Sequence, residues 1–462
     1  MRSLSSFSRR LATRRRSLRS SPCDCGPRVS FSLNGVTSGI NGAVPKAARS
    51  SGIISSNNKA EAESSPKSGG GSYSSGGTSS SSFGSDSDAA KLLKGSTVDH
   101  AVDLMSLRPG DRLEIPYEMT VTETIQEFWH AAFYSQDRIH TSRPFCRTMG
   151  LQDRVIPFSL ALFLTSSMTH EDAAKVQVGF GRVWYLWPTF AGDTFRKSFE
   201  VNKIRNTSDG SHSLIHFTCD LYNHRGRLCM RADKRLLFPL AVPESNASAS
   251  ANMKEPDKAY LFRDHLLSKA NTVLAEEPSH TLTRFHAGQC ILHSMNRSLT
   301  FSQSQQLASL ARLTHERHFD TKKYDRYSEI LIPAGLVLGL AMSASARDLH
   351  EILHEEILSV NYVNSLSPDQ IVGAVSYIER VEDINVPGDL EVLTVRTLGI
   401  KNMNVKRDLD QVGIPLELFQ SRTPKEIESI CKQQCPILMN KIVVQVERKI
   451  LRQSCREQVF LL

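Results

Sequence analysis

Two segments of the chain place ionisable side chains shortly before an apolar helix, and such a combination can move protons beside a carbonyl group. In the first segment these side chains precede the apolar run 156–164, and in the second they precede the small-residue run 332–342. The first segment contributes Asp137 and His140, and the second contributes His315, His318 and Asp320. We predict that these two loop–helix units form the functional centre of the protein.

The expected chemistry follows from the side chains and from the start of the helix. An imidazole, alone or beside a carboxylate, accepts and donates protons near neutral pH. Free N–H groups at a helix N-terminus stabilise an oxyanion or enolate, and Gly335 lets a ligand approach the backbone closely. These groups suit the addition or removal of water next to a thioester carbonyl. We predict catalytic roles for His318, His315, Asp137 and His140, and substrate-binding roles for Gly335 and Asp320.

Each of these residues also has a structural interpretation. The histidines and Asp137 can be ordinary loop residues, and Asp320 can cap the turn that follows it. Gly335 can be a glycine that only permits close packing. The two interpretations differ in whether the side chains share one pocket with the helix start.

The elements that would position these side chains follow two periodicities. An amphipathic helix is predicted over 125–134, and a strongly apolar helix, opened by Pro157, is predicted to end near residue 168. The surrounding segments alternate with a period of two, which is typical of strands. The predicted strands are 112–122, 174–188, 195–202, 212–222 and 227–239. One buried helix wrapped by a curved antiparallel sheet would bury the apolar faces of both, so we expect an α+β fold.

The pattern occurs twice along the chain. The matching landmarks are Gly110 and Gly288, His140 and His318, Pro157 and Pro333, and the turns 191–193 and 367–369. The separation along the chain is identical for the first two pairs, and it is only slightly shorter for the last two. Landmarks at a nearly constant separation predict a tandem duplication.

The duplication sets the expected domain boundaries. We predict a first unit over 96–243, a polar linker over 244–258, a second unit over 259–405 and a C-terminal helical extension over 406–462. In the extension, helices are expected over 424–431 and 437–451. The extension could be a packing arm or a partner surface, so a homodimer or membership of a larger complex is possible.

The N-terminal region has a composition of its own. Residues 1–22 contain seven arginines and no acid, with Leu4, Phe7, Leu11 and Leu18 on one helical face. This pattern predicts an organelle transit peptide, and the amphipathic stripe favours the mitochondrion. A plastid address and a disordered basic tail are the alternatives. Residues 23–95 are rich in Ser and Gly, so we expect a disordered linker.

The positive net charge of the whole chain does not indicate a nucleic-acid partner. Of the net charge of +8, residues 1–90 supply a surplus of seven, from twelve Lys and Arg against five Asp and Glu. The remainder of the chain is therefore close to neutral. No run of about twenty apolar residues predicts a membrane span. The nine cysteines have no repeated spacing, so no metal site is expected.

Three segments carry a resemblance to a known family. Residues 133–163 and 178–193, with the turn Pro-Thr-Phe-Ala-Gly-Asp, resemble the MaoC-like hotdog-fold dehydratases in their tandem double-hotdog form. They look most like the bacterial mesaconyl-CoA hydratases, and 306–345 is similar to the second half of those enzymes. The resemblance covers roughly residues 96–405. It implies hydration or dehydration of a short or branched, mesaconyl-CoA-like enoyl-CoA thioester, without a metal or redox cofactor.

The chain departs from the family pattern at the catalytic motif. The family separates its Asp and His by five residues, whereas Asp137 and His140 are three apart and position 135 is Ser. In the second unit the corresponding position is Leu313, and His315 stands where Asp137 stands in the first. These departures favour an alternative function, a hotdog scaffold without catalysis in a mitochondrial assembly. A thioesterase, with water activated by Asp137, is a third interpretation.

Overall fold

The structure is a computed structural model, and it describes residues 94–96, 103–115, 117–167, 174–247, 253–270, 274, 279–281, 283–384 and 390–455. The predicted transit peptide, 1–22, lies outside the described residues, as does nearly all of the predicted linker 23–95. Within the described part of the chain, no helix is both long enough and apolar enough to cross a membrane.

The first half of the body, called unit one below, is a helical segment followed by four long strands. Its α1 begins after Thr122, whose hydroxyl oxygen accepts a hydrogen bond from the backbone N–H of Ile125 at 3.4 Å, a typical helix N-cap. The elements are β1 Arg112–Glu114, β2 Met119–Thr120, α1 Glu123–Ala132, α2 Arg138–Thr141, α3 Arg143–Thr148, α4 Phe158–Ser166, β3 Val176–Tyr185, β4 Thr194–Asn206, β5 Ser213–Asn223 and β6 Leu228–Phe238. Two helices, α5 Glu244–Ala247 and α6 Leu261–Lys269, follow in the connection to the second half.

The second half, unit two, repeats the same order. Its α7 begins after Thr300, which forms a capping box with Gln303. Thr300 corresponds to Thr122 of unit one, because the two are as far apart along the chain as Gly110 and Gly288. The elements are β7 Cys290–Leu292, α7 Phe301–Leu310, the 3₁₀ turn η3 Glu316–His318, α8 Ala334–Ala346, β8 Ile352–Tyr362, β9 Val372–Ile384, β10 Leu390–Lys401, α9 Val405–Leu409, α10 Glu417–Gln420, α11 Pro424–Gln434, the turn η4 Pro436–Leu438 and β11 Ile442–Gln453.

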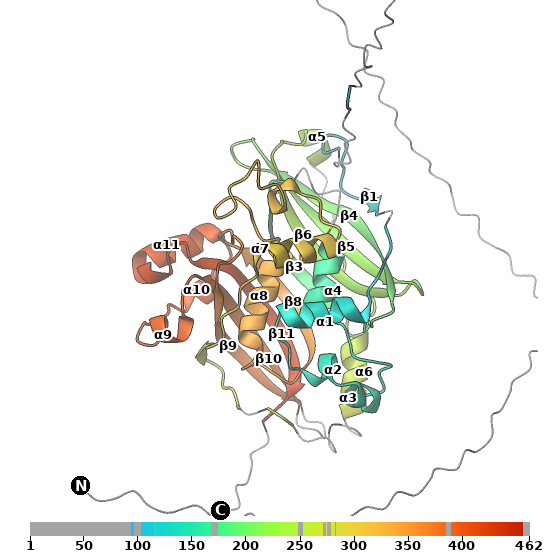
Figure 1. Cartoon of the computed structure of the whole chain (residues 1–462), viewed down its shortest axis with the longest axis vertical. Helices are drawn as coiled ribbons and strands as arrows, with labels where there is room; N and C mark the ends of the chain where they lie inside the picture. The colour runs from blue at the N-terminus through green and yellow to red at the C-terminus, as the bar shows by residue number, and fades with distance from the viewer. Residues whose placement is uncertain are drawn as a thin grey trace, which may run out of the picture. The chain divides into compact units, whose positions relative to one another are not determined.

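The strands of both units form one antiparallel sheet with internal symmetry. The strand order is β1-β4-β5-β6-β3-β8-β11-β10-β9-β7, with β2 beside β4. The adjacent strands β3 and β8, one from each unit, join the two halves, and the order outward from them is equivalent on both sides. The central helices α4 and α8 pack side by side against this sheet (Figure 1). The expected α+β fold, a sheet wrapped around a central helix in each unit, is confirmed.

The duplication extends to local geometry. The N–H of Gly110 donates to the carbonyl of Val201 at 2.7 Å, and the N–H of Gly288 donates to that of Ile378 at 2.8 Å. Both glycines have positive φ, 96° and 87°, a conformation that glycine adopts without steric cost. The equal separation of landmarks in the sequence therefore reflects two copies of one structure.

The C-terminal region corrects two predictions. Residues 437–451 were expected to form a helix, but β11 occupies Ile442–Gln453 and pairs with β8 and β10 in the middle of unit two. Unit two is therefore not complete at residue 405, because its last strand comes from the predicted extension. The expected helix over 424–431 is present as α11.

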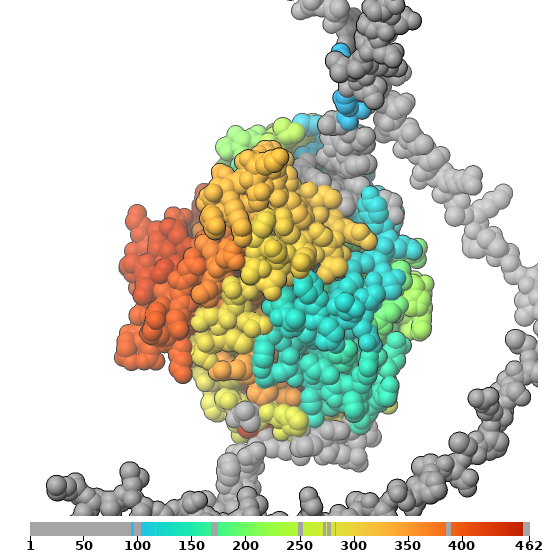
Figure 2. Space-filling view, in the orientation of Figure 1, coloured from blue at the N-terminus to red at the C-terminus, as the bar shows by residue number. Residues whose placement is uncertain are grey.

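The helices between β10 and β11 cover the second face of the sheet in unit two. On β10, Gly399 faces Ala341 of α8, whereas the neighbouring Leu398 and Ile400 belong to an apolar cluster with α9, α10 and α11. These helices lie at the left edge of the molecule, away from α8 (Figures 1 and 2). A role for this segment as a partner surface stays a prediction.

Candidate active site

The two predicted histidines are held in the same way in their two units. The Nδ1 of His140 lies 2.9 Å from the carbonyl oxygen of Val155, and the Nδ1 of His318 lies 2.8 Å from that of Leu331. A carbonyl only accepts hydrogen bonds, so each Nδ1 carries the proton. The Nε2 atom of each neutral ring therefore has a free lone pair, which makes it the atom able to accept a proton.

His318 is a largely buried, neutral base. Burial, and to a smaller extent the nearby His315 and Arg317, lower the pKa of His318 to about 4, against the opposing effect of the hydrogen bond to Leu331. The imidazole is therefore uncharged throughout the physiological pH range. It can accept a hydrogen bond from water through Nε2.

The start of α8 lines the same cavity as His318. The residue before the helix is Pro333, and no side chain caps the first turn. The N–H groups of Leu336 and Val337 donate to the carbonyl of Pro333, which leaves those of Ala334 and Gly335 without a partner within the helix. A Cβ added to Gly335 would lie 2.5 Å from Cδ2 of Phe163 in α4, so close packing of the two helices requires glycine here. The packing interpretation of Gly335 is therefore supported, and its role as an oxyanion donor stays a prediction.

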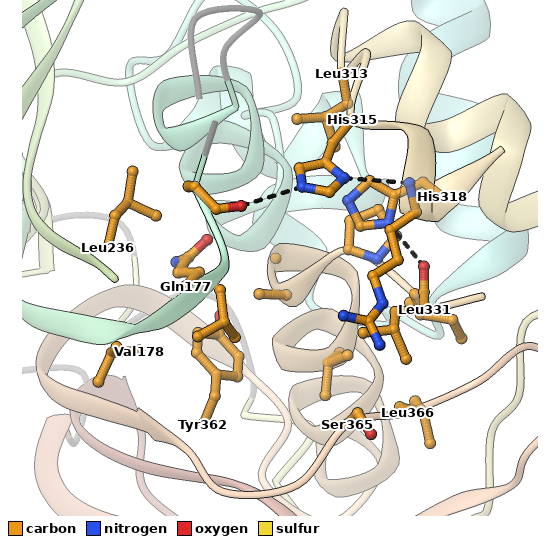
Figure 3. A pocket seen from close by; sticks show the side chains of 18 of the residues that line it. Gln177, Val178, Leu236, Leu313, His315, His318, Leu331, Tyr362, Ser365 and Leu366 are labelled. Atoms are coloured by element: carbon orange, nitrogen blue, oxygen red, sulfur yellow. Dashed lines mark hydrogen bonds between the residues drawn. The ribbon is translucent and has the colours of Figure 1, made fainter. Parts of the chain in front are cut away.

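His315, His318 and Gly335 line one cavity of about 360 Å³. Figure 3 shows the two histidines in its wall. Its walls come from both units, because the end of α4 and the start of β3 face the η3 loop, the start of α8 and the end of β8. Most of the lining is apolar. The polar side chains that line it are Ser166, Ser167, Lys175, Gln177, His315, Arg317, His318, Tyr362, Asn364 and Ser365. Among the described residues of the lining there is no carboxylate.

Both nitrogens of His315 already have backbone partners. Its Nε2 lies 3.1 Å from the carbonyl oxygen of Ala174, and its Nδ1 accepts a hydrogen bond from the N–H of Arg317 at 3.2 Å. His315 therefore fastens the loop of unit two to the entry of β3 in unit one. In this arrangement it has no free lone pair for a substrate, and its catalytic role stays a prediction.

Asp137 makes the equivalent contact in unit one. Its Oδ1 accepts a hydrogen bond from the N–H of Ile352, the first residue of β8 in unit two, at 2.9 Å. Burial raises the pKa of Asp137 to about 8. The structure brings Asp137 and His140 together, but at the far end of α8 from His318, His315 and Gly335.

The cavity beside Asp137 and His140 has a volume of only about 50 Å³. Helix α1 contributes Trp129 and Phe133 to its walls, and the Trp129 indole N–H donates to the Ser159 hydroxyl at 3.2 Å. The corresponding residues of α7 are Leu307 and Ala311, which are smaller and are not part of the lining of the large cavity. Two large aromatic side chains thus form part of the wall of the small cavity in unit one.

Asp320 lies outside the large cavity. Its Oδ1 accepts hydrogen bonds from the N–H groups of Lys322 and Lys323 at 2.9 and 3.1 Å. This is the geometry of a turn cap, and the structure gives no contact between Asp320 and the cavity. The predicted substrate contact is replaced by this structural role.

The sequence interpretation missed two polar residues of the cavity, Gln177 and Tyr362. Gln177 lies in β3 of unit one, and Tyr362 ends β8 of unit two. Strand pairing across the junction of the units brings them into one wall, and no local motif marks either residue. The one available signal in the sequence is that Gln177, a polar residue, lies between two valines on a predicted strand.

The lowered pKa of His140 makes a prediction about acid stability. Burial lowers its pKa to about 4, whereas an unfolded histidine titrates near 6.5. Between these values the unfolded chain binds more protons, so the free energy of unfolding falls as the pH falls from 6.5 towards 4. In His140→Asn the amide keeps a donor near Nδ1 and removes this titration. Between pH 6.5 and 4.5 the wild type should lose about 2 kcal/mol more than the variant in urea unfolding.

The difference in stability between the wild type and His140→Asn isolates the contribution of His140 from those of other titratable groups. Asp137, with its raised pKa, acts in the opposite direction, because the folded state holds its proton in this pH range and the unfolded state does not. That contribution is common to both proteins and cancels in the difference. An equal loss of stability in wild type and variant would show that His140 is not held neutral by burial.

Comparisons with known proteins place the fold. No family model matches the chain. It is 25% identical to the mesaconyl-CoA hydratase of Cereibacter sphaeroides over 256 residues, which cover 52% of this chain and 72% of that protein. A putative MaoC domain protein dehydratase from Chloroflexus aurantiacus superposes with a TM-score of 0.62 at 16% identity, over 78% of this chain and 100% of that one.

A second solved structure has the same architecture. It is a conserved hypothetical protein from Mycobacterium tuberculosis with a double hotdog fold, and it superposes with a TM-score of 0.54 at 14% identity. The match covers 76% of this chain and 99% of that protein. The chain therefore has a double hotdog fold and resembles the MaoC-like dehydratases.

Proposed function

We propose that the protein adds water to, or removes it from, an enoyl-CoA thioester in the cavity of unit two. The observation that carries this proposal is that His318 and the uncapped start of α8 line the same cavity. One group handles a proton, and the other stabilises negative charge on an oxygen. The resemblance to mesaconyl-CoA hydratase supports the same reaction class.

In the hydration direction, the oxygen of water bonds to C3 of the enoyl group while Nε2 of His318 takes a proton from that water. The electron pair of the double bond moves to the thioester oxygen, where the N–H groups at the start of α8 stabilise the enolate. The imidazolium then returns the proton to C2, so the base is regenerated. Dehydration is the same sequence in reverse. The neutral state of His318 fits the first step, which requires a free lone pair.

We further propose that the acyl group is short or branched, similar to mesaconyl. The 25% identity to a mesaconyl-CoA hydratase supports this choice, and so does the cavity volume of about 360 Å³. A volume at the lower end of the range for small-molecule pockets suits an acyl group of a few carbons better than a long chain.

A second candidate function is binding of an acyl thioester without turnover. The resemblance implies an aspartate beside the catalytic histidine. The described residues that line the cavity include no carboxylate, and this favours the second function. In this case the cavity would still bind a thioester, and His318 would only contribute a hydrogen bond.

One assay separates these functions. The purified full chain is given crotonyl-CoA, mesaconyl-CoA and itaconyl-CoA, while the absorbance of the conjugated thioester and the release of free thiol are followed together. Loss of the conjugated absorbance without thiol release is the expected result. Thiol release would identify a thioesterase, and binding without either change would identify a non-catalytic thioester binder.

A further inference from the structure

Two polar side chains in the cavity of unit two have no hydrogen-bond partner among the described residues. They are the hydroxyl of Tyr362 and the amide nitrogen Nε2 of Gln177, and both atoms are buried. A buried polar group without a partner loses its hydrogen bonds to water and gains none in return, which destabilises the fold. Such groups are therefore rare in folded proteins unless a ligand or water pairs with them.

These two groups are brought together by the junction of the units. In the pairing of β3 with β8, Gly179 lies opposite Asn361. Gln177 is two residues before Gly179, and Tyr362 is one residue after Asn361, so both belong to the same end of this strand pair. In Figure 3 they lie on the cavity wall across from His318. An acyl chain bound between the walls would have His318 on one side and this pair on the other.

The pair is suited to bind an oxygen atom. The amide nitrogen of Gln177 only donates hydrogen bonds. Burial raises the pKa of Tyr362, so its hydroxyl keeps the proton and also donates. The surrounding lining is apolar, with Val178, Leu236 and Leu366 among its members. A plain alkyl chain placed here would leave both donors unpaired.

We propose that Tyr362 and Gln177 bind an oxygen on the acyl chain itself, beyond the thioester, and so select oxygen-bearing acyl groups over plain alkyl ones. This inference rests on the proposed function for the presence of a thioester in the cavity, and it goes further by assigning the specificity of the distal end. The oxygen can belong to a carboxylate or to a neutral hydroxyl. Both chemistries accept hydrogen bonds from the same two donors.

Calorimetric binding of three saturated thioesters of similar size tests the proposal without turnover. Succinyl-CoA carries a carboxylate, 4-hydroxybutyryl-CoA carries a hydroxyl, and butyryl-CoA carries neither. The full chain should bind at least one of the first two about tenfold or more tightly than butyryl-CoA, a ratio that corresponds to about 1.4 kcal/mol and to one hydrogen bond. Tighter binding of succinyl-CoA identifies the oxygen as that of a carboxylate, and tighter binding of 4-hydroxybutyryl-CoA identifies it as that of a hydroxyl.

Variants show whether the named side chains cause the preference. Tyr362→Phe and Gln177→Met should each weaken binding of the preferred oxygen-bearing thioester about tenfold and leave butyryl-CoA binding unchanged or slightly stronger. Tyr377→Phe, which removes a hydroxyl from the cluster under α10 and α11 instead, is the matched control and should change none of the three affinities.

Three results would overturn the proposal, and they differ in what else they remove. Equal binding of all three thioesters by the wild type, or equal weakening of all three in Tyr362→Phe, removes the specificity pair and leaves the proposed function intact. No binding of any of the three removes the proposed function as well.

Discussion

The variant His318→Asn should lose enoyl-CoA hydration by roughly 10²–10⁴-fold in kcat, the usual contribution of a positioned general base. The Asn amide keeps a donor for the carbonyl of Leu331, to which Nδ1 of His318 lies at 2.8 Å, but it has no lone pair at the place of Nε2. The loop should therefore keep its position while the proton acceptor is lost. Steady-state kinetics with the best enoyl-CoA substrate measures the change.

The internal duplication provides the matched control. His140→Asn makes the same substitution on the equivalent histidine, whose cavity of about 50 Å³ is lined by Trp129 and Phe133. Its kcat should stay within about threefold of wild type. A large loss in His140→Asn with little loss in His318→Asn would move the site to unit one and contradict the assignment. Similar losses in both variants would point to a general effect on the fold.

The variant Arg448→Met should lower the free energy of unfolding by about 3–5 kcal/mol, the usual cost of leaving one partner of a buried ion pair uncompensated. Arg448 of β11 pairs with Glu355 of β8 at 3.1 Å and donates to the Ser345 hydroxyl at the end of α8 at 3.0 Å. Its side chain is 1% exposed and that of Glu355 is 10% exposed. Methionine keeps the apolar stem but leaves the Glu355 carboxylate without its cation, and urea unfolding measures the difference.

Arg407→Met is the control for the loss of an arginine. Arg407 pairs with Asp408 at 2.7 Å, but its side chain is 77% exposed, so solvent screens the pair and it contributes little to stability. The unfolding midpoint should hardly change. If Arg448→Met were equally mild, β11 would not be the central, charge-paired strand of unit two that the structure shows.

The first unit and the duplication could be predicted from the sequence because both depend on local patterns. The strands β3 to β6 alternate with a period of two, and short turns connect them, so each is visible without knowledge of its partner. The glycines at 110 and 288 and the helices that begin after Pro157 and Pro333 mark equivalent points in the two copies.

The strand β11 could not be predicted in the same way. The whole helical segment α9 to α11 separates it from β10 along the chain, whereas β6 follows β5 after a short turn. Helix α8 covers one face of the sheet there, and α9 to α11 cover the other, so almost every residue of β11 is buried. Arg448 and Arg452 occupy buried positions because Glu355 and Glu391 pair with them. A strand buried on both faces with charged residues inside has no simple alternation.

The grouping of the site residues also depended on the tertiary structure. The sequence shows two similar loops, but only the antiparallel packing of α4 and α8 places them at opposite ends of the helix pair. Asp137 is thereby separated from His318, although the sequence interpretation gave catalytic roles to both. The two ends also differ in the volume of their cavities, about 360 Å³ beside His318 and about 50 Å³ beside His140.

The most direct test of the site is a crystal structure of the full chain with a bound, unreactive saturated thioester, either succinyl-CoA or 4-hydroxybutyryl-CoA, whichever binds more tightly. The thioester oxygen should lie within hydrogen-bond distance of an N–H group at the start of α8, and Nε2 of His318 should face carbons 2 and 3 of the acyl chain. A thioester bound beside His140 in unit one, or only on the outer surface with the cavity of unit two empty, would contradict the assignment.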